Sequence, residues 1–136
     1  MNGFIQLIAV GFLASILTLS EPTTTTIEDE KIPPSADLLQ NPITGDLKAT
    51  SQGARIYKKI CWVCHGDNGN GEGPQAIEIK TKVLSFNDEQ VLNRSDGALY
   101  WWIENGGNDM QPYKDVLSKK DLWKTVNYVR KTQNKL

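Results

Sequence analysis

The sequence predicts an all-α fold of three to five helices. Apolar residues recur at helical spacing in several stretches after residue 50, and no stretch alternates apolar and polar residues convincingly as a half-buried strand would. Segments rich in glycine and proline separate the helical stretches. With 136 residues, the chain fits one small domain with extensions.

The composition is that of a soluble protein. Hydrophobic residues make up 39% of the chain, and a domain of this size buries only a modest core. The formal net charge of −1 argues against nucleic acid as a partner, because binding to phosphates requires an excess of cations.

Residues 1–20 are expected to be a signal peptide or an N-terminal anchor. Residues 4–19 are almost all apolar and carry no charge, but sixteen residues fall short of the roughly 20 that a spanning helix needs. Thr18 and Ser20 have the spacing of a cleavage site, which would leave Glu21 as the first mature residue. Because no Lys or Arg precedes the apolar run, a retained anchor stays open. Both alternatives place the rest of the chain outside the cytoplasm.

Residues 21–48 are expected to form a flexible linker that is mobile or lies along the domain surface. The segment contains four consecutive threonines at 23–26, an acidic cluster at 28–30 and several prolines. No helical or strand period is visible in it.

The folded domain is expected to span residues 49–136, and its first helix to follow Ser51 as N-cap. This helix should run into the segment 61–65. It has apolar residues at helical spacing, namely Ile56, Tyr57, Ile60 and Val63.

Further helices are expected after a glycine-rich loop at residues 66–74. One short stretch covers 88–94, and a longer helix begins after Ser95 as N-cap and stops at Gly106. An irregular segment with Met110 and Pro112 follows.

The last helix is the clearest in the sequence. Ser118 and Asp121 resemble a capping box at its start. It carries one apolar stripe, formed by Leu122, Trp123, Val126 and Val129.

Residues 61–65 read Cys-Trp-Val-Cys-His and contain both cysteines and the only histidine of the chain. Cys-x-x-Cys-His is the attachment sequence for c-type haem. The thiols of Cys61 and Cys64 can each form a thioether with one haem vinyl group, and His65 is then the fifth ligand of the iron. Such attachment is generally completed outside the cytoplasm, which agrees with the export prediction.

Other interpretations of this motif fit less well. A structural zinc site needs four ligands, and the chain offers three Cys or His residues. A thioredoxin-like motif expects a βαβ context, which is absent. The loop 67–72 has Gly69 and Gly71 where a calcium loop requires oxygen ligands. A disulfide across so short a spacing would act as a redox switch rather than stabilise the fold.

Met110 is the predicted sixth ligand. No second histidine exists, and Met1 lies in the leader, so Met110 is the only methionine of the folded region. Its thioether is a good ligand for haem iron in electron carriers. A methionine is more often core filler, but Met110 does not lie at helical spacing.

The four tryptophans are expected to pack in the core around the haem, because large aromatic side chains dominate the energetics of small cores. Electron relay through them is the alternative. They are Trp62, Trp101, Trp102 and Trp123.

Over roughly residues 41–132 the chain resembles the class I c-type cytochromes, small bacterial monohaem proteins. The matching residues are Gly53, Tyr57, His65-Gly66, Gly73-Pro74, the segment 95–100, Gly106, Met110, Pro112-Tyr113, the segment 121–123 and the segment 128–130. The chain departs from the family pattern at Gln111, where proline often follows the ligand, and in the segment 77–86, which lacks the usual prolines.

The resemblance implies a cytochrome c-like fold around one covalently bound haem c, with its iron held by His65 and Met110. It also implies that the N-terminal and C-terminal helices cross near Gly53. The Pro74 carbonyl would accept a hydrogen bond from the His65 ring and so orient this ligand.

The function implied is electron transfer without catalysis, because two protein ligands leave no open iron position. The donor would be a quinol-oxidising complex or a dehydrogenase, and the acceptor a terminal oxidase or reductase. The protein would work in the periplasm or at the outer face of the cytoplasmic membrane, with membrane contact only through an uncleaved N-terminal segment. The alternative is a gas- or peroxide-binding sensor or enzyme with an open sixth position. The chain could also be a fixed subunit of a larger complex.

Overall fold

The computed structural model describes residues 32–134, so the predicted signal or anchor lies outside the described residues. In this part of the chain the fold is all-α, as predicted, with five α-helices, two 3₁₀-helices and no β-strand. No helix within these residues has the length and apolarity needed to cross a membrane. The elements are η1 (Pro34–Leu38), α1 (Leu47–Ile60), α2 (Trp62–His65), η2 (Ala76–Glu78), α3 (Glu89–Leu92), α4 (Asp96–Asn105) and α5 (Lys119–Thr132).

The first long helix, α1, begins earlier than the sequence suggested. Asp46 is its N-cap, and its Oδ1 accepts a hydrogen bond from the Ala49 amide at 2.9 Å. Ser51 lies inside the helix, where its hydroxyl donates to the Leu47 carbonyl. The prediction of Ser51 as N-cap is therefore wrong. The first turn of α1 carries no apolar stripe, so the sequence pattern did not show that the helix begins before Ser51.

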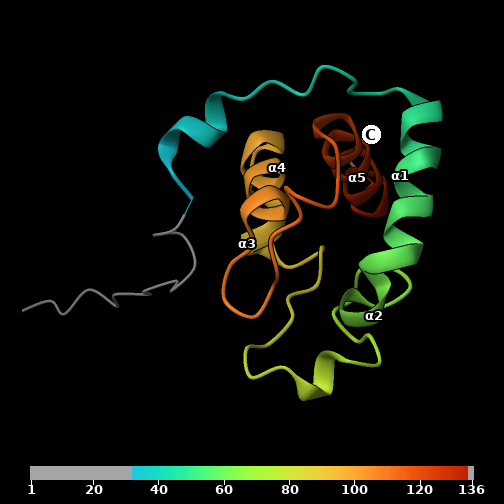
Figure 1. The fold of residues 1–136 in the computed structure, drawn as a ribbon, viewed down its shortest axis with the longest axis vertical. Helices are drawn as coiled ribbons and strands as arrows, with labels where there is room; N and C mark the ends of the chain where they lie inside the picture. Colours follow the sequence, from blue (N-terminus) through green and yellow to red (C-terminus); the bar gives the residue numbers. More distant parts are fainter. Residues whose placement is uncertain (1–31, 135–136) are drawn as a thin grey trace, which may run out of the picture.

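α1 and α5 cross at very short range and form the largest helix contact of the described residues. A Cβ atom added at Gly53 would lie 1.9 Å from the Lys124 carbonyl oxygen of α5, so only glycine permits this approach. The two helices lie side by side in Figure 1. The crossing near Gly53 is thus confirmed.

The starts of α4 and α5 agree with the sequence. The Ser95 hydroxyl accepts from the Ala98 amide at 3.0 Å, and the Ser118 hydroxyl accepts from the Asp121 amide at 3.2 Å. α4 ends at Gly106, whose φ of +69° favours glycine.

The described part of the segment 21–48 lies along the domain surface. Ala36 of η1 is 2% exposed. A Cβ added at Gly97 of α4 would lie 1.9 Å from the carbonyl oxygen of Ala36. The side chain of Asn127, fully buried on α5, accepts from Asn41 Nδ2 at 2.8 Å and donates to the Ile43 carbonyl at 2.7 Å. These contacts fasten residues 36–43 to α4 and α5. The boundary at residue 48 stays a prediction.

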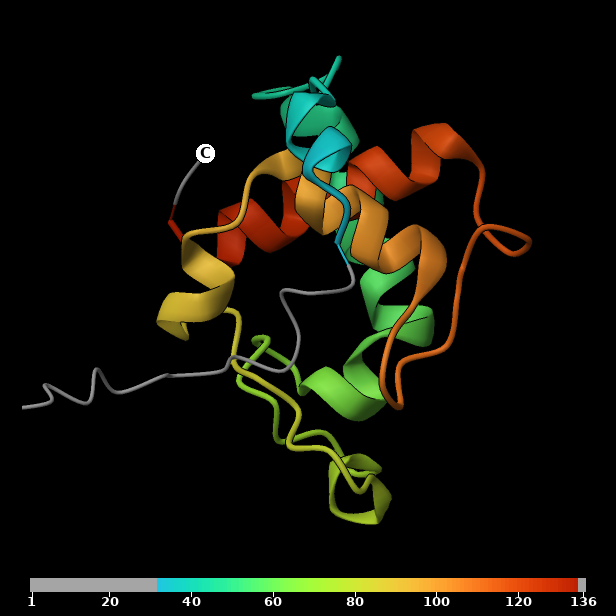
Figure 2. The ribbon, with the colours of Figure 1, turned by 90° about the vertical axis from the view of Figure 1, so that its left-hand side faces the viewer.

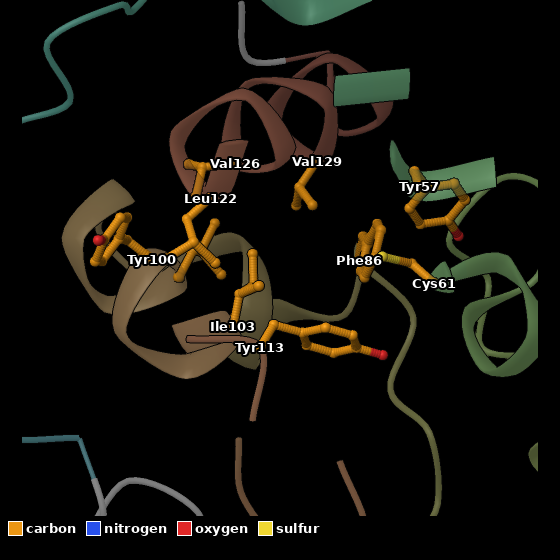
Figure 3. Packing of buried hydrophobic residues seen from close by; sticks show 10 residues of the cluster. Tyr57, Cys61, Phe86, Tyr100, Ile103, Tyr113, Leu122, Val126 and Val129 are labelled. Carbon is orange, nitrogen blue, oxygen red and sulfur yellow. The ribbon is translucent and has the colours of Figure 1, made fainter. Parts of the chain in front are cut away.

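The core lies where α4 and α5 face each other and extends toward the end of α1. In Figure 3, Leu122 and Val126 of α5 lie near Tyr100 and Ile103 of α4. At the other end of the same cluster, Phe86 lies beside Tyr57 and Cys61, which come from α1 and its C-terminus. The core therefore leads directly to the Cys-x-x-Cys-His segment.

Replacing Gly53 by alanine tests the helix crossing. The new methyl group would meet a backbone carbonyl that cannot rotate away, so Gly53→Ala should lower the free energy of unfolding by about 1–3 kcal/mol. This loss is expected although alanine is the better helix former. Urea unfolding measures it, and Ser51→Ala on the exposed face of α1 is the control that should not destabilise. A Gly53→Ala protein as stable as the original would contradict the close crossing.

Candidate haem site

The two cysteines and the histidine lie on one helical turn at the end of α1. Cys61 ends α1 and precedes the short helix α2, and the amides of Cys64 and His65 both donate to the Cys61 carbonyl, at 3.2 and 3.0 Å. Residues three and four apart on a helix share a face. Gly66, with φ of +77°, then turns the chain away. The three side chains consequently line the same cavity.

This cavity has a volume of about 430 Å³, within the range of small-molecule and cofactor sites. Five segments other than α1 and α2 contribute to its wall: the lobe from Gln75 to Phe86, the segment with α3 and Arg94, α4, the loop that contains Met110, and α5. Figure 2 shows this lobe and α2 together at one end of the molecule, with the loop after α4 extending toward them. Most lining residues are apolar, among them Ile60, Val63, Leu84, Leu99, Ile103 and Val129.

His65 faces the cavity as a neutral imidazole. Burial lowers the pKa of His65 to about 4, so at pH 7 the ring carries no charge and one nitrogen has a free lone pair. Its ring packs against Phe86 with centroids 5.1 Å apart. Among the buried side-chain polar atoms of the described residues, only Nδ1 of His65 lacks a hydrogen-bond partner. Such an orphaned atom is costly unless a bound group changes its surroundings.

The hydrogen bond from the His65 ring to the Pro74 carbonyl is not made in this structure, since Nδ1 has no partner. The segment around Pro74 is nevertheless fixed beside α2. The amide of Gly73 donates to the Cys64 carbonyl at 3.1 Å, and the amide of Gln75 donates to the Val63 carbonyl at 2.9 Å. Pro74 is exposed and does not line the cavity. Its role stays a prediction.

The two cysteines do not form a disulfide with each other. Cys61 is buried, and burial, followed by the proximity of Cys64, raises the pKa of the Cys61 thiol to about 12. Cys64 is half-buried. The two thiols are therefore available on the cavity wall, as attachment to a cofactor requires.

The glycine-rich loop is hydrogen-bonded to Tyr57 and Phe86, and Phe86 packs on the His65 ring. The hydroxyl of Tyr57, on α1, donates to the Gly66 carbonyl, and the Phe86 amide donates to the Gly69 carbonyl at 2.7 Å. Gly69 has φ of +70°, and a Cβ there would lie 2.2 Å from the Phe86 ring. The loop thus holds Phe86 against the His65 ring.

Met110 reaches the cavity from a tight turn. Gly107 and Met110 exchange both backbone hydrogen bonds at 2.9 Å, and Asn108 adopts a positive φ of 50° between them. Met110 packs against the hydrophobic core and lines the cavity. The structure therefore brings together four of the five predicted site residues, with Pro74 outside the lining.

Several lining residues could not be singled out from the sequence. Phe86 is an isolated aromatic residue without helical neighbours, so no pattern marked it. Lys82 and Arg94 also line the cavity, and the Arg94 guanidinium lies 5.7 Å from the centre of the Trp102 ring. Two cations in a mostly apolar cavity suit the two carboxylates that every haem carries.

The residues of this cavity fit a haem. They supply paired thiols for covalent attachment, a neutral imidazole, a thioether and broad apolar walls. When bound, haem iron supplies reversible one-electron oxidation and reduction. An all-α fold with this set of groups defines a c-type cytochrome.

The comparison with protein families agrees with this class. The family described as "Cytochrome C oxidase, cbb3-type, subunit III" matches residues 48–129, which is more than half of the chain. The chain belongs to this family. Covalently bound haem c with its iron is the cofactor, and the family supports haem-based electron transfer.

Solved structures show the same fold. The Kuenenia stuttgartiensis reducing HAO-like protein complex Kustc0457/Kustc0458 contains a chain 26% identical, with a TM-score of 0.62, matched over 69% of this chain and 49% of that one. This chain thus spans about half the length of that neighbour. The KustC0563 c-type cytochrome is 25% identical, with a TM-score of 0.52 and coverage of 60% and 96%.

A third solved structure supports the fold alone. Cytochrome CL from Methylophaga aminisulfidivorans MPT is 20% identical, with a TM-score of 0.53 and coverage of 70% of this chain and 65% of that one. No curated protein sequence matches the chain.

Two glycines with similar positive φ angles allow the packing of Phe86 on His65 to be tested. Gly69 and Gly45 have φ of +70° and +77°, but a Cβ on Gly45 would meet nothing within 4 Å. Gly45→Ala should therefore cost only backbone strain, about 1–2 kcal/mol. Gly69→Ala should cost about 1–3 kcal/mol more, because the methyl group displaces the Phe86 ring. Urea unfolding of both variants measures the difference, and equal losses would mean that the loop does not hold Phe86.

Proposed function

We propose that this protein carries single electrons between redox protein partners through one haem, covalently attached by Cys61 and Cys64, whose iron is bound by His65 and Met110. The observation that carries the proposal is the convergence of these four side chains on one apolar cavity from two separate segments. Cys61, Cys64 and His65 come from the turn after α1, and Met110 comes from the loop after α4.

Each residue has a distinct proposed role. The two thiols fix the cofactor covalently, His65 supplies the fifth ligand and Met110 the sixth. A sulfur ligand raises the reduction potential relative to a second imidazole, which suits a carrier that accepts electrons readily. In the haem-loaded protein, the Pro74 carbonyl would accept a hydrogen bond from the His65 ring and so orient this ligand.

Such a protein performs no catalysis of its own, because protein groups fill both axial positions. The surrounding fold keeps the ligands in place in both oxidation states, so little reorganisation accompanies each transfer. An open sixth position would instead suit a sensor or enzyme that binds gas or peroxide, and the spectroscopic test below separates the two.

The proposed setting is the periplasm or the outer face of the cytoplasmic membrane. Cytochrome c domains are typically exported, and the apolar run at residues 4–19 supports export. The donor would be a quinol-oxidising complex or a dehydrogenase and the acceptor a terminal oxidase or reductase of a respiratory chain. The resemblance to a chain of a multi-protein complex also supports a role as a tethered subunit.

The absorption spectrum tests the ligation. The haem-loaded protein should show a sharp low-spin reduced spectrum and a weak long-wavelength band from methionine sulfur bound to ferric iron. Met110→Ala should abolish this band completely and lower the reduction potential, because the sulfur ligand is gone.

The exposed Val116, in the same loop, provides the control, since Val116→Ala should leave both the band and the potential unchanged. A wild-type protein that is high-spin and shifts its spectrum with carbon monoxide would contradict the proposal, and the sensing or catalytic function would replace it.

A further inference from the structure

The two neighbours of Met110 each make a hydrogen bond to a different wall of the cavity. Asp109 Oδ2 accepts from the backbone amide of Thr81 at 2.9 Å, which ties the turn to the lobe that holds residues 75–86. On the other side, Gln111 Nε2 donates to the Tyr113 hydroxyl at 3.2 Å. Thr81 and Tyr113 both line the cavity.

Tyr113 connects Gln111 to the attachment helix. Its hydroxyl accepts from Gln111 and donates to the carbonyl of Ile60, the last residue of α1, at 3.5 Å. The backbone of Tyr113 is fixed separately, because its amide donates to the Ile103 and Glu104 carbonyls at the end of α4. Gln111 is thus linked through one buried ring to the segment that carries Cys61.

We propose that Asp109 and Gln111 are positioning residues that hold the Met110 turn across the cavity mouth, one against the lobe and one against the end of α1. This inference rests on the proposed ligation by Met110. Neither side chain needs to touch the haem; each acts through the backbone of the turn. Gln111 is also a position where the chain departs from the family pattern, and here it gains a specific partner.

The physical need for such contacts follows from the turn itself. Methionine has three rotatable side-chain bonds and adapts its shape easily, so the place of its sulfur depends on the place of its backbone. The base of the turn is tight, since a Cβ on Gly106 would lie 2.5 Å from the Met110 carbonyl oxygen. The tip, by contrast, consists of exposed residues, and the Asp109 contact ties it to the lobe.

The consequence is a barrier against competing ligands. A foreign ligand reaches the sixth position only when the Met110 turn opens, and opening breaks both hydrogen bonds. Each bond should therefore strengthen the closed state by the modest amount typical of a partly exposed hydrogen bond. The two bonds reach different walls, so their effects should multiply.

Imidazole binding to the ferric, haem-loaded full chain measures this opening, with the loss of the methionine band as readout. Asp109→Ala and Gln111→Ala should each lower the apparent Kd for imidazole by roughly twofold to tenfold. Asp109→Asn keeps an acceptor oxygen for the Thr81 amide and should stay within twofold of the original. The double alanine variant should show the product of the two single effects.

Asp115→Ala is the matched control for charge, because Asp115 is an exposed carboxylate later in the same loop. It should leave the Kd unchanged. Hydrogen exchange of the Thr81 amide provides a separate readout, and it should accelerate more in Asp109→Ala, where the amide loses its acceptor, than in Gln111→Ala, where only opening becomes easier. Unchanged Kd values in both alanine variants, or an equal shift in Asp115→Ala, would overturn the inference.

Met110→Ala separates this inference from the proposed ligation. If Met110 binds the iron, this variant takes up imidazole far more tightly than the original. Tight binding by Met110→Ala together with unchanged Asp109→Ala and Gln111→Ala overturns only the positioning roles. An unchanged Kd in Met110→Ala overturns the ligation and, with it, the inference.

Discussion

The close crossing of α1 and α5 is the constraint on which the site depends. Because Gly53 has no side chain, the backbone of α1 rests directly on the Lys124 carbonyl of α5. This contact fixes the direction of α1, and therefore the place where the helix ends and the turn with Cys61 begins. Tyr57, one helical turn further along α1, is completely buried. Its hydroxyl donates to the Gly66 carbonyl and so ties α1 to the glycine-rich loop. The attachment segment is thus held by backbone packing rather than by its own short helix.

The second half of the site has a separate origin. The loop with Met110 leaves α4 at Gly106 and returns to α5 after Tyr113, so α5 supports both halves, one through α1 and one through this loop. Its side chains Leu122 and Val126 are almost completely buried in the core that α5 shares with α4. α5 therefore packs against both α1, which leads to the histidine side of the cavity, and α4, which leads to the methionine side. A carrier that must change its charge without changing its shape needs this kind of support.

Most short-range signals in the sequence were reliable, although Ser51 is not the N-cap of α1. The Cys-x-x-Cys-His turn, the caps at Ser95 and Ser118 and the apolar stripe of α5 each depend on residues within a few positions, and the structure agrees with them. Apart from the helix crossing at Gly53, which the family resemblance implied, contacts distant in sequence were missed. Asn41 meets Asn127 across 86 positions, so the fastening of residues 36–43 could not be predicted. Trp62, expected in the core, is 37% exposed and does not line the cavity. The contact between the rings of Phe86 and His65 was missed for the same reason. The position of Phe86 depends on the path of a loop that no local sequence pattern predicts.

The central claim is that the turn after α1 carries a covalently bound haem. Mass spectrometry of the protein, produced in a host that exports it and attaches haem, tests this most directly. Trypsin cleaves after Lys59 and Lys80, and the resulting peptide 60–80 contains both cysteines and the histidine. This peptide should carry the mass of one haem, and Cys61→Ala with Cys64→Ala should abolish the modification. An unmodified peptide 60–80 from protein whose haem is extracted by acidic solvent would contradict it.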